Sequence, residues 1–267
     1  MSILKNRIVF TVLFLSIPTM ADFEKVEMKN LNINYRNPNG TATAEVFDAK
    51  GERFVNEKMK VTREETQLRL SLESGEEAII EDVSDTLLDA SPALISKLNF
   101  LSKDQRLDFN VAGVQFVNDD STSSMSGLIF RCLKNSNYQE EWEKYLDACT
   151  TESLLNMTKL SISNKSSLSS ALKNLSGMSN KASDTTVSDL RLMVKNHALS
   201  FSVNIGVKVT GSGSIIYKKT GDKNLVQIRI DKVKAGFFTV TNRFFSTLSS
   251  VQSANVRVQK PYIYIDF

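Results

Sequence analysis

Histidine and cysteine are scarce in this chain. Its 267 residues include one His, His197, and two Cys, Cys132 and Cys149. One His cannot both act as the base of a catalytic triad and anchor a metal site, and two thiols add too few ligands for zinc. The serine elbow Gly-x-Ser-x-Gly of hydrolases is also missing. The sequence therefore predicts no catalytic residue, no metal and no cofactor, and we do not expect an enzyme.

An excess of charge of one sign is missing as well. The chain has 33 Lys and Arg against 30 Asp and Glu, a formal charge of +3. Lys5 and Arg7 carry two of these positive charges, so the chain beyond residue 21 has a formal charge of +1. Proteins that bind nucleic acids usually present a strongly basic surface to the phosphates. We therefore expect no nucleic-acid partner.

Only one long apolar run occurs, from Ile8 to Ile17. It follows a short basic region and precedes the small-residue segment Pro18 to Ala21, which is the arrangement of a secretory signal peptide. An uncleaved membrane anchor is the alternative, but this run has about half of the ~20 residues that span a bilayer. We expect residues 1–21 to be removed and the mature chain, from about Asp22, to be periplasmic or secreted.

An even number of cysteines in an exported protein favours a disulfide, here between Cys132 and Cys149. The two cysteines flank a polar, helix-like stretch from Asn137 to Leu146. We place them in a helical or loop connection, residues 132–185, between two β-rich halves.

Alternating polar and apolar residues dominate the rest of the chain. The longest such run, Leu199 to Val209, predicts one long strand with a buried and a wetted face. Gly211-Ser212-Gly213 is interpreted as the turn after it and not as a phosphate-binding loop, because no Lys follows. His197 is expected on the strand surface.

The first half, residues 22–131, is predicted to be β-rich, with a register change near Asn30 and an exposed hairpin end at Arg63–Glu65. Helices are expected near residues 76–101, where apolar residues recur at helical spacing. These residues are Ile79, Val83, Leu87 and Leu88, followed by Ala93, Leu94, Leu98 and Leu101.

The second half, residues 186–267, repeats this order of elements, with a helix expected near residues 237–251. An internal pseudo-duplication is therefore a hypothesis. The predicted fold class is α+β and β-dominated. We expect one or more long, antiparallel, curved sheets covered by a few amphipathic helices.

Three segments close the chain: the strand-like Asn224 to Val233, the Phe-rich helix, and the strand-like Val256 to Ile265. Their polarity pattern resembles that of bacterial periplasmic tubular-lipid-binding-like (TULIP-like) domains over residues 186–267. In that family a helix packs into a curled sheet and leaves an apolar channel. The resemblance implies a lipid-binding protein.

Five apolar residues of the predicted helix form the candidate ligand-binding site: Phe237, Val240, Phe244, Phe245 and Leu248. They would line a groove for an acyl chain if the sheet encloses the helix incompletely, and core packing is the alternative. We hypothesise that the protein binds a lipid or another apolar small molecule.

Two other functions stay open. The first is a structural or interaction module of the bacterial envelope, which would use a protein partner and no ligand. The second is an outer-membrane barrel, suggested by the alternating run that ends on Phe267, although the predicted helices argue against it.

We predict that cells expressing the full-length gene release a protein that starts near Asp22. Intact-mass measurement of the envelope or culture fraction checks this, because loss of residues 1–21 lowers the mass by a defined amount. Recovery of only the unprocessed chain in the membrane fraction would contradict the prediction.

Overall fold

The computed structural model describes residues 25–49, 52–65, 67–80, 89, 91–103, 106–118, 121–133, 142–163, 184–220, 223–249 and 255–266. The predicted signal peptide therefore lies outside the described residues. Segment 81–88, on which part of the helices predicted near residues 76–101 falls, lies outside them as well. The same holds for segments 134–141 and 164–183 of the predicted connection 132–185. The chain divides into two compact units, residues 1–128 and 129–267. Strand β8 (Ser121–Leu133) spans this boundary.

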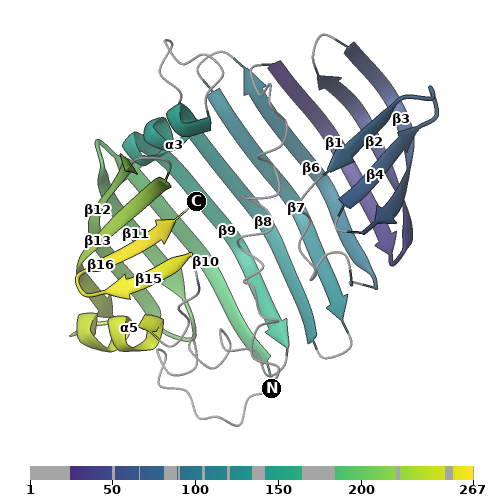
Figure 1. Cartoon of the computed structure of the whole chain (residues 1–267). Helices are drawn as coiled ribbons and strands as arrows, with labels where there is room; N and C mark the ends of the chain where they lie inside the picture. The colour runs from purple at the N-terminus through teal and green to yellow at the C-terminus, as the bar shows by residue number, and fades with distance from the viewer. Residues whose placement is uncertain are drawn as a thin grey trace. The chain divides into compact units, whose positions relative to one another are not determined.

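Unit 1 is an antiparallel sheet (Figure 1). Its hydrogen-bonded strand order is β8-β7-β6-β1-β2-β3-β4-β5. The strands are β1 (Lys25–Arg36), β2 (Asn39–Ala49), β3 (Glu52–Glu64), β4 (Gln67–Leu72), β5 (Glu77–Ile80), β6 (Ala93–Lys103) and β7 (Arg106–Asn118).

Unit 2 continues from β8 with the order β8-β9-β10-β11-β12-β13-β16-β15, and β14 pairs with the end of β13. Its strands are β9 (Glu152–Ser163), β10 (Asp184–Lys195), β11 (Ala198–Asn204), β12 (Lys208–Thr220), β13 (Lys223–Ala235), β14 (Phe238–Thr239), β15 (Val256–Gln259) and β16 (Tyr262–Asp266). Two helices belong to the described part of the chain, α3 (Trp142–Thr151) and α5 (Thr241–Leu248). The predicted β-dominated, antiparallel class is confirmed.

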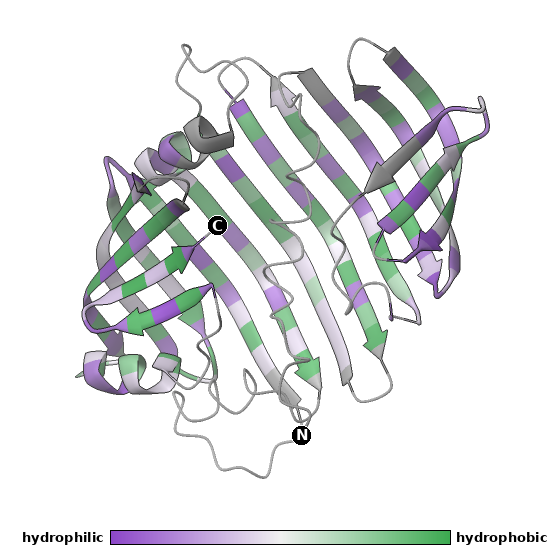
Figure 2. Ribbon diagram, viewed as in Figure 1, coloured by the Kyte–Doolittle hydropathy of each residue, from purple (hydrophilic) through white to green (hydrophobic). Residues whose placement is uncertain are grey.

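Alternation of side chains creates these strands. In β4, Leu68, Leu70 and Leu72 are buried, while Gln67, Arg69 and Ser71 between them are partly exposed. The same alternation is visible as green and purple bands along many strands in Figure 2. One buried face per strand is the usual outcome for an antiparallel sheet, because successive side chains point to opposite faces. The hairpin end predicted at Arg63–Glu65 is confirmed between β3 and β4.

The helix expected from Ala93 to Leu101 is wrong, because these residues form β6, and Glu77–Ile80 is also a strand. Lys97 explains the error: it has a φ of 50° and forms a β-bulge, a residue inserted into the strand. A bulge shifts the alternation by one position. Apolar residues on either side of it then fall at spacings of three and four, which imitate a helix.

A second bulge at Asn30 of β1 compensates for the first. Met28 pairs with Phe100, Leu31 with Leu98, and Ile33 with Ile95, so each strand gains one residue and the register is restored. The register change predicted near Asn30 is thereby confirmed. Without the second bulge, one of the two strands would turn its apolar residues to the wrong face.

Asparagine side chains bind the backbone groups that the bulges leave unpaired. The Asn30 amide donates to Oδ1 of Asn99 at 2.9 Å, and the Lys97 amide donates to Oδ1 of Asn32 at 2.9 Å. Asn99 Nδ2 also donates to Oδ1 of Asn110 at 2.8 Å. Each bulged strand is therefore held by an Asn of its neighbour, which removes the penalty of an unmade backbone hydrogen bond.

The single long strand predicted from Leu199 to Val209 is also wrong, because the chain turns at Ile205–Val207 and forms the hairpin β11–β12. Gly206 has a φ of 86°, which is easiest for glycine. Val203 pairs directly with Val209, so both side chains lie on the same face. Because the loop has an odd number of residues, polar and apolar residues keep alternating from β11 through the loop into β12. The alternation in the sequence therefore gives no sign of the turn.

The predicted disulfide is confirmed in unit 2, where Cys132 of β8 and Cys149 of α3 are joined. Cys132 is buried. The bond closes a loop with a sequence separation of 17 and ties α3 to the sheet.

No helix in the described ranges is long and apolar enough to cross a membrane.

We predict that the double variant C132S/C149S loses about 3 kcal/mol of unfolding free energy, because the unfolded chain regains the entropy that the closed loop removes. Urea denaturation under oxidising conditions measures the difference. Reduction of the native protein should lower its unfolding free energy similarly and leave the variant unchanged. Equal stability of native and variant proteins would contradict the prediction.

Candidate functional site

Unit 2 carries a continuous apolar face that crosses its strands from β9 to β15. Residues paired across neighbouring strands share a face, so the pairing defines its rows. One row is Leu155, Leu192, Phe201, Gly211 and Val233. A second is Val194, Leu199, Gly213 and Ile230, and a third is Ile215, Ile228, Ile263 and Val258. We call these three rows the apolar face.

The apolar face is only partly covered. Val194, Leu199, Ile230 and Val233 are buried. Leu155, Leu192, Phe201, Ile215, Ile228 and Ile263, in contrast, each keep an intermediate exposure. Large hydrocarbon side chains therefore retain contact with solvent in the middle of a sheet.

Helix α5 connects to this face through aromatic rings. Phe244 stacks on Phe201 of the apolar face, with ring centroids 6.0 Å apart and planes at 27°. Phe245 meets Phe244 edge to face at 5.6 Å and is itself only 4% exposed. Such aromatic pairs stabilise by about 0.5–1.5 kcal/mol beyond the area that they bury. The rings hold α5 to the sheet and leave Phe201 and Phe244 partly accessible.

Hydrogen bonds fix where α5 begins. The Val240 amide donates to the carbonyl oxygen of Val233 at 2.8 Å. The Val233 amide in turn donates to Oγ1 of Thr241 at 2.9 Å. The first residue of the helix is therefore tied to β13 by its side chain and by the backbone that precedes it.

Gly211 and Gly213 do not form the predicted turn. Both lie inside β12, on the apolar face. A Cβ on Gly211 would come within 2.3 Å of two ring carbons of Phe201, and one on Gly213 within 1.8 Å of the Arg229 carbonyl oxygen. Glycine is therefore needed because the Phe201 ring and the neighbouring backbone approach β12 closely.

The predicted site residues separate into two groups. Phe244, Phe245 and Leu248 lie on α5, with Val240 just before it. The helix expected near 237–251 begins only at Thr241, because Gly236, with a φ of 56°, turns the chain and β14 pairs with β13. Phe237 and Phe238 are thus outside the helix and 100% and 76% exposed. Phe201 is not among the predicted site residues, although the alternation of its strand places it on the apolar side.

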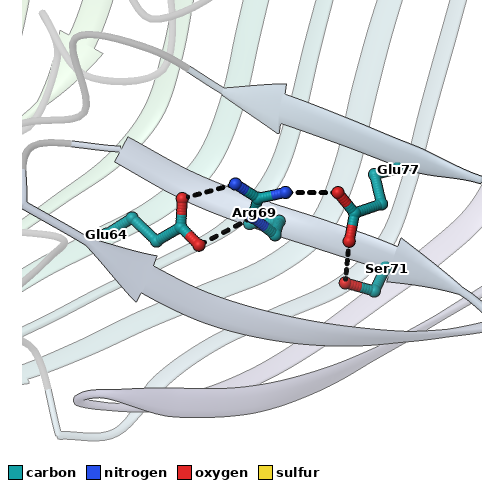
Figure 3. Close-up of polar contacts among 4 residues, drawn as sticks. All are labelled: Glu64, Arg69, Ser71 and Glu77. Carbon is teal, nitrogen blue, oxygen red and sulfur yellow. Dashed lines mark hydrogen bonds and ion pairs between the residues drawn. The ribbon is translucent and has the colours of Figure 1, made fainter.

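The β3–β4–β5 edge of unit 1 carries a polar cluster around Arg69 (Figure 3). Arg69 makes a fork to Glu64, with Nε–Oε1 at 2.7 Å and Nη2–Oε2 at 2.8 Å, and its Nη1 contacts Glu77. Ser71 donates to Glu77 at 3.4 Å. The hydrogen bond from Arg69 lowers the pKa of Glu64, and the two carboxylates raise the pKa of Arg69. Because a general acid needs a raised carboxyl pKa, this arrangement suits a strand-bridging ion pair and not proton donation.

His197 lies in the two-residue turn between β10 and β11, and not on a strand surface as expected. Asn196 and His197 have φ values of 49° and 62°, typical of a tight hairpin turn. The backbone of His197 supports the sheet, since its carbonyl accepts from the Ile215 amide at 2.9 Å. Among the described residues, no three His, Cys, Asp or Glu side chains gather as metal ligands would.

Comparison with protein-family models, with curated proteins and with solved structures finds no match to this chain. The similarity to TULIP-like domains therefore stays a prediction.

We predict that Gly211→Ala destabilises the protein by about 1–3 kcal/mol, because the added methyl group collides with the Phe201 ring. Urea denaturation measures the loss. In a Phe201→Leu background the same substitution should be less harmful, since the ring is gone.

Gly113→Ala is the matched control for this prediction. Gly113 also lies inside a strand, β7, but the near neighbour of its added Cβ is the Ser96 hydroxyl, which can rotate away. The prediction would be contradicted if Gly211→Ala lowered the free energy of unfolding equally in the native protein and in the Phe201→Leu background. Glycine at position 211 would then not be required by the Phe201 ring.

Proposed function

We propose that this chain is an exported, non-enzymatic protein that binds a lipid or another apolar molecule on the apolar face of unit 2, beside α5. The partly exposed apolar side chains around the Phe201–Phe244 stack are the main support for this proposal. Leu155 and Leu192 share the row of Phe201 and extend this set across β9 and β10.

The chemistry of this surface favours a hydrocarbon ligand. Covering an apolar surface gains about 25 cal/mol per Å² of area removed from water, or ~0.8 kcal/mol per methylene group of an acyl chain. From β10 to β15 the three rows contain only hydrocarbon side chains and glycine, and on β9 Leu155 continues the first row while the buried Ser153 pairs with Val194 of the second. They therefore select a ligand by its apolar character.

The disulfide supports the exported part of the proposal. Disulfides persist in the periplasm and outside the cell, whereas cytosolic thiols are kept reduced. The Cys132–Cys149 bond is thus consistent with an extracytoplasmic protein, as the signal-like segment Ile8–Ile17 predicts. We further propose that α5 acts as the amphipathic cover of a curved sheet. The pseudo-duplication of the two halves stays a hypothesis.

The test compares two neighbouring residues of β10 that face opposite sides. Leu192 lies on the apolar face, whereas Met193 points to the other side and is 42% exposed. Protein purified from cell envelopes should carry bound lipid, detected by native mass spectrometry and by organic extraction. Leu192→Glu should lower the lipid per protein at least tenfold, because a bound hydrocarbon chain would remove the new carboxylate from water without a compensating partner.

Met193→Glu is the matched control and should keep the lipid. Thermal unfolding of both variants separates loss of binding from loss of folding. Lipid-free native protein in every preparation, or an equal loss in both variants, would contradict the proposed function.

A further inference from the structure

An exposed aromatic tip lies at the end of the β13–β14 hairpin. Phe237 is 100% exposed and the adjacent Phe238 76% exposed, which makes them the most exposed large apolar side chains in the described part of the chain. Gly236 and Phe237 form the loop, and Ala235 pairs with Phe238 across it. We call Phe237 and Phe238 the aromatic tip.

Backbone hydrogen bonds hold the loop of the aromatic tip against the sheet, although its two side chains are exposed. The Gly236 amide donates to the carbonyl oxygen of Lys208 at 3.0 Å, which ties the loop to β12. On the other side, the Val240 amide is bound to Val233 of β13. The hairpin therefore presents both rings without losing the entropy of ordering a flexible loop on binding.

Basic residues surround the base of the tip. Lys234 pairs with Thr239 of the hairpin, Lys232 is two residues earlier on the same face of β13, and Lys208 belongs to the neighbouring strand. All three are exposed, and none forms an ion pair with another described residue. The nearby carboxylate of Asp231 is bound to Arg229 at 2.8 Å. Between residues 199 and 249 the sequence has eight basic and two acidic residues, in contrast to the near-neutral whole.

We propose that the aromatic tip inserts into the surface of an anionic phospholipid bilayer while Lys208, Lys232 and Lys234 contact the headgroups. Phenylalanine beside lysine is the composition of interfacial membrane anchors. Interface size favours a bilayer over a protein partner. Two Phe side chains bury about 300–500 Å². That is less than the ~800 Å² per partner in a stable protein interface.

Flotation with vesicles tests this inference on the protein that cells process from the 267-residue chain. The protein should float with vesicles of phosphatidylcholine and phosphatidylglycerol, less with phosphatidylcholine alone, and less as salt increases. F237S/F238S should bind at least tenfold more weakly. Lys208→Gln/Lys232→Gln/Lys234→Gln should bind about a hundredfold more weakly, at roughly fivefold per lysine.

Matched controls use exposed residues of unit 1. Val55→Ser removes a side chain that is 56% exposed, and Lys58→Gln/Lys60→Gln removes two exposed charges of β3. Both controls should float as the native protein does. A second measurement tests whether the side chain at position 237 enters the bilayer. The fluorescence of the Trp introduced by Phe237→Trp should be quenched by brominated lipid more strongly than the fluorescence of the native Trp142.

The inference does not rest on the proposed function, because F237S/F238S should keep the lipid content that Leu192→Glu loses. Absence of flotation with anionic vesicles would overturn it. Undiminished flotation of F237S/F238S would also overturn it. If that variant instead loses a co-purifying protein and its flotation does not change, the inference is overturned and the aromatic tip is assigned to binding a protein.

Discussion

Every side chain of an antiparallel strand is committed to one face by its position in the alternation, and this constraint governs both units. A shift of one residue would move a whole strand's apolar set to the solvent side. The paired bulges at Asn30 and Lys97 show how the constraint is met in unit 1, since each corrects the register error of the other. The asparagines around them satisfy backbone groups that the sheet itself cannot.

In unit 2 the same constraint gathers the apolar residues on one face. Within this face the Phe201 ring approaches the backbone of Gly211 closely. Phe201 can lie this close to Gly211 because no Cβ stands between them, and Phe244 stacks on the same ring. Three elements, β11, β12 and α5, are thus joined through one aromatic ring. The stack combines a structural role, holding α5, with accessible hydrocarbon, the property on which the proposed ligand site depends.

The polar features of the described residues have mainly structural roles. Arg69 links β3, β4 and β5 through the carboxylates of Glu64 and Glu77, and His197 contributes its backbone to a hairpin. Exposed ion pairs of this kind contribute little to stability, at a median of about 0–1 kcal/mol. The chemistry that distinguishes the protein is therefore apolar: a partly covered face in unit 2 and an aromatic tip at its β13–β14 hairpin.

The sequence alone determined the β-dominated class, the hairpin end at Arg63–Glu65, the register change near Asn30 and the disulfide. Each depends on local signals, namely period-2 alternation, turn residues and cysteine count. Three features lay beyond it: the bulge at Lys97, which imitated a helix, the turn at Gly206, which left the alternation in phase, and the exposure of Phe237. They depend on which strands pair and in which register, and pairing joins residues far apart in the chain. Only the tertiary structure could therefore place Phe201 against Gly211 and Phe244, and leave Phe237 in solvent.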